Sequence, residues 1–244
     1  MNEPVCYLAL AAYPAIVILV FNWAGASALW ARKNRSFFLP PDLKKESEES
    51  GRLLALFRYG LLLLVLRGLA GSGLWYMVPV ATNLRAFLFF MVLGVAGGLF
   101  VLACRHALSA LSPSAASAEN NEYLLRGPIV LWLTIFLTGG IVEEFWQAVC
   151  IVCFTENGYS RISALLLTAF AFSLAHSAGL PSRIAPGMVN LFTETLVGLM
   201  LGGLFLWSGN LVTPSVASVI YFASSFFIVR RPLGRVANPS APLK

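Results

Sequence analysis

The sequence predicts an all-α fold, a polytopic membrane bundle of about seven transmembrane helices. Of its 244 residues, 58% are hydrophobic and only 11% are charged, whereas a soluble domain carries about 25% charged residues. The mean hydropathy is +0.78. The apolar residues also gather in stretches long enough to cross a bilayer, which takes about 17–25 residues. These observations exclude a soluble globular protein.

The apolar stretches predict the individual helices in order along the chain. Their bounds are Val5–Trp30, Leu53–Val80, Ala86–Leu108, Pro128–Phe154, Ile162–Ala178, Gly187–Trp207 and Leu211–Val229. We expect the first to be a retained span, because no basic residue precedes it and it is longer than the core of a signal peptide. The small residues 24–28 resemble a cleavage site, but close helix packing explains them better.

The rest of the chain predicts one integral membrane domain over residues 1–244, with polar loops at 31–52 and 109–127 and a basic tail at 230–244. Lysine and arginine concentrate in alternate loops, which predicts an outside N-terminus and a cytoplasmic C-terminus. We expect the bilayer to be a bacterial inner membrane. The formal charge of +6 is spread along loops and contacts lipid, so no nucleic-acid partner is predicted.

Cysteines and glycines favour packing roles. Cys6, Cys104, Cys150 and Cys153 all lie within or at the ends of apolar spans, so we expect no disulfide framework. Cys150 and Cys153 form a C-x-x-C pair, for which small apolar packing residues are a better interpretation than a redox or metal site. The glycine pairs Gly139-Gly140 and Gly202-Gly203 predict close helix contacts that hold polar side chains at fixed depth.

Two carboxylates stand out because they lie within an apolar span. Glu143 and Glu144 sit inside Pro128–Phe154, where a charged group costs about 2.5–3.5 kcal/mol on insertion scales. Adjacent residues on a helix point about 100° apart, so one carboxylate can react while the other supports the site. His176 in the next span is a proton carrier or metal ligand near neutral pH. The glutamates and this histidine are the strongest indication of a functional site in the sequence.

These residues resemble a known family. The pair Glu143-Glu144, the spacing Phe172-x-x-x-His176 and the turn 208–214 look like the three signature regions of the CPBP intramembrane proteases, a group that includes type II CAAX prenyl endopeptidases and lysostaphin-resistance proteins. The similarity covers about Pro128 to Phe227, and the helices of this CPBP-like catalytic region span 128–229. The resemblance implies that Glu143, Glu144 and His176 are the catalytic residues. Glu143 would be the general base for water, Glu144 the supporting carboxylate, and His176 the residue that holds the water or a metal. It implies hydrolysis of a peptide bond in a membrane-associated peptide or protein.

The sequence departs from that family at three positions. The arginine of the first region is replaced by Ala148, and the histidine and asparagine of the third region by Ser218 and Phe222. Removing one oxyanion donor costs about 2.7–4 kcal/mol, so other groups must substitute. Ser218 can still donate one hydrogen bond.

Further polar residues could complete the site. We expect Glu194, with Asn190 one turn before it, to face the same cavity, the alternative being a protonated carboxyl bonded to a neighbouring helix. Arg67 could replace the missing arginine by pairing with a carboxylate, whereas Arg58 fits snorkelling to the interface.

A metal ion and two other functions stay open. Zinc or another divalent metal could bind Glu143 and His176, and Glu194 would supply the third protein ligand that a catalytic zinc usually has. A catalytically weak or inactive relative would act as a membrane scaffold or regulator. A proton-coupled transporter would use the same polar residues as a relay.

Overall fold

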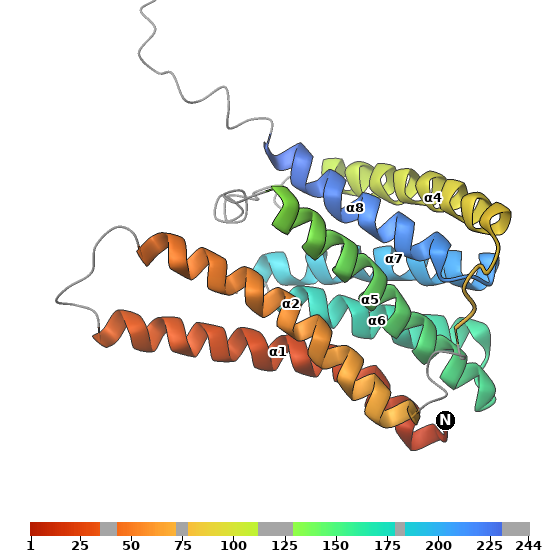
Figure 1. Ribbon diagram of the computed structural model, residues 1–244, viewed down its shortest axis with the longest axis horizontal. Helices are drawn as coiled ribbons and strands as arrows, with labels where there is room; N and C mark the ends of the chain where they lie inside the picture. Colours follow the sequence, from red (N-terminus) through yellow and green to blue (C-terminus); the bar gives the residue numbers. More distant parts are fainter. Residues whose placement is uncertain (35–42, 72–77, 112–128, 179–183, 231–244) are drawn as a thin grey trace, which may run out of the picture.

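The computed structural model describes residues 1–34, 43–71, 78–111, 129–178 and 184–230, and all regular structure within them is helical. The all-α prediction is therefore confirmed. The described helices are α1 (Glu3–Asn34), α2 (Leu43–Ala70), α4 (Leu84–Leu111), α5 (Ile129–Glu156), α6 (Arg161–Ala178), α7 (Ile184–Ser208) and α8 (Val212–Arg230). Successive helices run in opposite directions along the bundle (Figure 1).

Among the described residues, four helices contain stretches long and apolar enough to cross a membrane: α1, α4, α5 and α7. Shorter apolar helical stretches occupy 161–176 and 212–224. The chain is thus an integral membrane protein with a helical bundle, and the number of seven spans stays a prediction.

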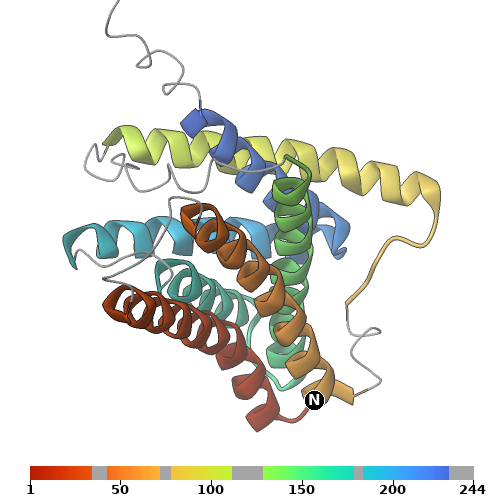
Figure 2. The ribbon, with the colours of Figure 1, turned by 60° about the vertical axis from the view of Figure 1, so that its left-hand side comes forward.

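Helix α5 forms the centre of the bundle. It packs against α1, α2, α6, α7 and α8, and every residue from Val142 to Ile151 is buried. The α1–α2 hairpin lies on one side of α5 and the α4–α8 pair on the other (Figures 1 and 2). The glutamate pair therefore lies in the most enclosed part of the protein, and the side chains around it come from several helices.

Glycines permit the closest helix contacts, as predicted. A Cβ on Gly140 would lie 2.6 Å from the Val219 side chain in α8, and one on Gly202 would lie 2.9 Å from the Gln147 amide nitrogen. Gly203 has open space where a Cβ would be, so the prediction of close contact is wrong at that position.

Helix boundaries differ from the predicted ones at the first two connections. Helix α2 begins at Leu43, within the stretch predicted as a loop, and ends at Ala70 instead of Val80. Gly71 follows with a φ of 64°, a conformation that terminates helices and that glycine adopts without strain. Most of the predicted loop 109–127 and all but the first residue of the tail 230–244 lie outside the described residues.

One cysteine prediction is wrong. Cys6 near the start of α1 forms a disulfide with Cys153 near the end of α5, so these two residues do more than fill apolar space. Cys150 is a free, buried thiol, as expected for a packing residue, and the C-x-x-C is not a pair. The bond joins two helices at the end of the bundle that contains the N-terminus.

Candidate functional site

Glu143 and His176 meet in the interior of the bundle. The carboxylate oxygen Oε2 of Glu143 lies 3.3 Å from Nε2 of His176, and Glu143 is fully buried. The two residues come from consecutive antiparallel helices, α5 and α6. Sequence reasoning brought these two together through their order and spacing, and the structure places them in direct contact.

The imidazole of His176 is held by two stacked aromatic rings and at one nitrogen. Nδ1 lies 3.0 Å from the backbone carbonyl oxygen of Phe172, and because a carbonyl only accepts, Nδ1 carries the proton. Phe172 stacks on the imidazole with ring centroids 4.1 Å apart, and Phe222 stacks on it with ring centroids 5.8 Å apart. In the neutral ring, the lone pair of Nε2 therefore points toward Glu143.

The other oxygen of Glu143 is surrounded by donors. The hydroxyls of Tyr13 in α1 and Tyr59 in α2 both donate to Oε1, the second at 2.9 Å. The guanidinium of Arg58 lies 3.5 Å from the same oxygen and donates to the Tyr59 hydroxyl at 2.6 Å. Glu143 Oε2, in contrast, is buried and has no hydrogen-bond partner among the described residues. One carboxylate oxygen is thus anchored and the other is presented to His176.

Glu144 faces a different helix, as the 100° rotation between adjacent residues requires. Its carboxyl lies against Ser218 in α8, and both residues are buried. Neither Glu144 Oε1 nor the Ser218 hydroxyl has a hydrogen-bond partner in the described structure. Ser218 therefore accompanies the second glutamate, and Phe222, one turn later, packs on the histidine.

The remaining predicted residues lie further from the reacting pair. Glu194 in α7 accepts a 3.4 Å hydrogen bond from Tyr221, although it is near enough to His176 to act on it electrostatically. Asn190 belongs to α7, and its side chain lies outside the described part of the chain. Glu194 therefore belongs to an adjoining contact between α7 and α8.

The expected role of Arg67 is wrong, and so is the expected role of Arg58. The exposed Arg67 donates to the backbone oxygen of Gly71 at 2.7 Å, which caps the end of α2. Arg58 does not snorkel to the interface, because its guanidinium reaches Glu143 in the interior. Sequence reasoning also missed Tyr13 and Tyr59. The available signal was a polar hydroxyl on each of two apolar spans.

The donor set does not fit a catalytic zinc. Glu143 Oε2 and His176 Nε2 converge, but no group of three histidine, cysteine, aspartate or glutamate side chains with metal-binding geometry occurs among the described residues. Glu194, the predicted third ligand, bonds to Tyr221. A catalytic zinc usually has three protein ligands, so no reaction step is assigned to a metal.

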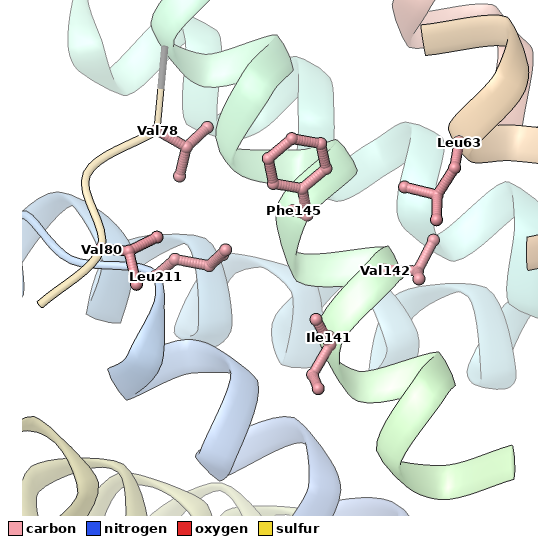
Figure 3. A pocket seen from close by; sticks show the side chains of 7 residues that line it. All are labelled: Leu63, Val78, Val80, Ile141, Val142, Phe145 and Leu211. Carbon is pink, nitrogen blue, oxygen red and sulfur yellow. The ribbon is translucent and has the colours of Figure 1, made fainter. Parts of the chain in front are cut away.

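An apolar pocket of about 200 Å³ lies near the site, between α2, the segment before α4, α5 and the start of α8. Figure 3 shows its lining side chains: Leu63, Val78, Val80, Ile141, Val142, Phe145 and Leu211. Cavities of about 150 Å³ hold a benzene molecule. With no polar side chain in its lining, this pocket can hold an apolar group but cannot activate water.

Comparison with known proteins agrees with the resemblance seen in the sequence. Residues 125–222 match the family model described as type II CAAX prenyl endopeptidase Rce1-like. The match includes Glu143, Glu144, His176, Ser218 and Phe222. Neither a curated protein nor a solved structure matches the chain at a significant level.

Proposed function

We propose that this integral membrane protein, whose residues 125–222 match the Rce1-like family model, is an intramembrane endopeptidase that hydrolyses a peptide bond with a water molecule activated by Glu143. The observation that carries the proposal is the 3.3 Å contact between Glu143 Oε2 and His176 Nε2 inside an apolar bundle. A buried carboxylate oxygen that receives no hydrogen bond from a described residue is costly, and a functional role explains why it is present at this position.

The chemistry follows from the two atoms that face each other. Water donates one proton to Glu143 Oε2 while its oxygen attacks the carbonyl carbon of the peptide bond. Nε2 of His176 accepts the second hydrogen of that water as a hydrogen bond and so fixes its orientation. The tetrahedral intermediate then loses its C–N bond as the nitrogen takes the proton back from Glu143. The products are a carboxylic acid, which keeps the second hydrogen of the water, and an amine, and Glu143 is again ionised.

The position of the site favours cleavage near the cytoplasmic face. Glu143 lies thirteen residues before the end of α5 at Glu156, about 20 Å at 1.5 Å per residue, within a hydrocarbon core of about 30 Å. His176 lies two residues before the end of α6. Together with an outside N-terminus, these ends favour a site in the cytoplasmic part of the membrane.

The disulfide supports that orientation. Disulfides persist in oxidising compartments such as the bacterial periplasm and are rare in the cytosol. Cys6 and Cys153 lie at the end of the bundle that the distribution of lysine and arginine places outside. Both arguments favour a protein of the bacterial inner membrane with an outside N-terminus and a cytoplasmic C-terminus.

A second candidate function is a relative that binds membrane proteins without cleaving them. The observation that favours it is Phe222, which packs on the His176 ring where the family has an asparagine and offers no donor to an oxyanion. Ser218, the other replacement, lies against Glu144. Proton-coupled transport is less favoured, because Glu143 and Glu144 point to different helices and have different partners.

A membrane-peptide library distinguishes these functions. Purified protein in proteoliposomes is incubated with the library, and the products are mapped by mass spectrometry. We expect cleavage by the wild type and by Glu156→Gln, whose carboxylate is exposed on the same helix, but not by Glu143→Gln or His176→Ala. Equal cleavage by all four proteins, or no cleavage by the wild type, refutes the proposed endopeptidase function. Substrate-dependent proton flux that Glu143→Gln abolishes would instead favour transport.

A further inference from the structure

The α1–α2 hairpin, which lies outside the matched segment 125–222, supplies three polar side chains to the site. Tyr13 and Tyr59 are buried, with 1% and 4% of their surface exposed, and both donate to Glu143 Oε1. A buried tyrosine hydroxyl needs a partner, but two such hydroxyls from different helices on one oxygen exceed what packing requires. This convergence determines which way the carboxylate points.

Arg58 orients the second of these hydroxyls. Its guanidinium donates to Tyr59 Oη at 2.6 Å and lies 4.6 Å from the centre of the Tyr59 ring. Since Tyr59 Oη accepts a hydrogen bond from Arg58, its own proton is available for Glu143. The charge of Arg58, 3.5 Å from Oε1, also favours an ionised carboxylate in an apolar bundle.

The three donors differentiate the two oxygens of Glu143. Oε1 receives the hydroxyl protons and the nearby positive charge, whereas Oε2 receives no hydrogen bond from a described residue and faces His176 Nε2. A carboxylate that is free to rotate would offer either oxygen at varying angles. This one presents a single oxygen at a fixed angle, which is the geometry a general base needs.

The surrounding helices are built to keep the donors in place. Gly139 makes room for Tyr59, because a Cβ there would lie 2.7 Å from the Tyr59 hydroxyl oxygen. On the α1 side, the Trp146 indole donates to the backbone oxygen of Ala9 at 2.7 Å, one turn from Tyr13. The Cys6–Cys153 disulfide closes the same seam about two turns from Tyr13 in α1 and from Trp146 in α5.

We propose that Tyr13, Tyr59 and Arg58 are positioning residues that hold Glu143 as the general base. They take the place of the first-region arginine, whose position here is the buried Ala148. This inference rests on the proposed function, since a base needs positioning only if it takes a proton. It assigns a catalytic purpose to α1 and α2, for which the sequence offered no motif.

The test uses conservative variants with matched controls. Tyr13→Phe and Tyr59→Phe each remove one hydroxyl, and Tyr7→Phe removes an exposed hydroxyl from α1. Arg58→Met removes the guanidinium, and Arg67→Met removes an exposed one from the same helix. Arg58→Lys keeps the charge and serves as the conservative rescue.

The first readout is the steady-state cleavage of a peptide selected from the library. Removing a hydrogen bond to a charged group typically changes an equilibrium by about 10- to 150-fold. We expect kcat to fall about tenfold or more in Tyr13→Phe, Tyr59→Phe and Arg58→Met, with KM within about twofold. Arg58→Lys should recover part of the loss, and the Tyr7 and Arg67 controls should match the wild type.

The second readout does not need activity. The infrared carboxylate band of Glu143 is isolated by subtracting the spectrum of Glu143→Gln, and we expect it to shift in Tyr13→Phe and Tyr59→Phe but not in Tyr7→Phe. A band that stays in place in both variants overturns the positioning role, and so does an unchanged kcat in monodisperse, folded variants. A wild type that cleaves nothing refutes the proposed function, while the infrared result still decides whether the hydroxyls hold Glu143.

Discussion

Replacing Gly139 with alanine should lower the cleavage rate by displacing the Tyr59 hydroxyl from Glu143. Gly139 lies in α5 one turn before Glu143, where a Cβ would be 2.7 Å from the Tyr59 hydroxyl oxygen. Ordinary contact begins near 3.4 Å, so the hydroxyl must withdraw by about 0.7 Å. If it withdraws along the bond, its distance to Glu143 Oε1 grows from 2.9 Å to about 3.6 Å, at which no hydrogen bond remains.

The magnitude follows from the hydrogen bond that is lost. A hydrogen bond to a charged group contributes about 1.5–3 kcal/mol, so we expect kcat to fall by about 10- to 150-fold. The effect on folding should be smaller, because overpacking costs about 1–3 kcal/mol while the better helix propensity of alanine returns about 1 kcal/mol. The expected loss in activity, about 1.5–3 kcal/mol, is therefore larger than the expected net cost to folding, about 0–2 kcal/mol.

The assay is peptide cleavage in proteoliposomes, with thermal unfolding measured in parallel. The matched control is Gly60→Ala, which makes the same substitution beside Tyr59 in α2, at a position with no neighbouring atom within 4 Å. We expect Gly60→Ala to cleave at the wild-type rate. Wild-type kcat in Gly139→Ala, or an equal loss in both variants, would refute the reasoning.

Three further predictions concern the disulfide, the histidine and metal. Cys6→Ser should lower the free energy of unfolding under oxidising conditions by at most about 5 kcal/mol, the chain-entropy value for a separation of 147 residues. The control Cys104→Ser changes a free cysteine and should leave the unfolding temperature unchanged. Equal unfolding temperatures for the wild type and Cys6→Ser would contradict the disulfide. Phe222→Ala should loosen the His176 ring and reduce kcat about tenfold by misaligning the water, with KM nearly constant in cleavage assays; an unchanged kcat would show that the stacking is dispensable. Treatment with a chelator should leave the cleavage rate unchanged, and elemental analysis should find no stoichiometric metal, because the described donor set lacks a third ligand. A loss of activity that added zinc restores would contradict this prediction.

The sequence was most informative where an ionisable residue, whose insertion into a bilayer costs free energy, interrupts an apolar span. Glu143 and His176 were predictable because membrane-embedded ionisable groups are costly and their order matches a family pattern. The all-α fold followed from the length of the apolar stretches. The end of α2 was not predictable from apolarity, because the stretch from Leu53 continues to Val80 while Gly71 terminates the helix.

The side chains that contact Glu143 could not be predicted from the sequence, for a physical reason. In helices that are apolar on all sides, periodicity does not show which face points inward. The inward direction of Tyr13, and the choice between Arg58 and Arg67, therefore depended on contacts between distant helices. The Cys6–Cys153 bond was also missed, because a contact between residues 147 positions apart leaves no local pattern in the sequence.

The central claim is that Glu143 is the base that activates water. The most direct measurement is the cleavage rate of one library-selected peptide by the wild type, by Glu143→Gln and by the exposed control Glu156→Gln. General bases contribute about 10²–10⁴-fold, so we predict a loss of at least about 100-fold in Glu143→Gln and none in Glu156→Gln. A Glu143→Gln protein that cleaves the peptide at the wild-type rate would contradict the account.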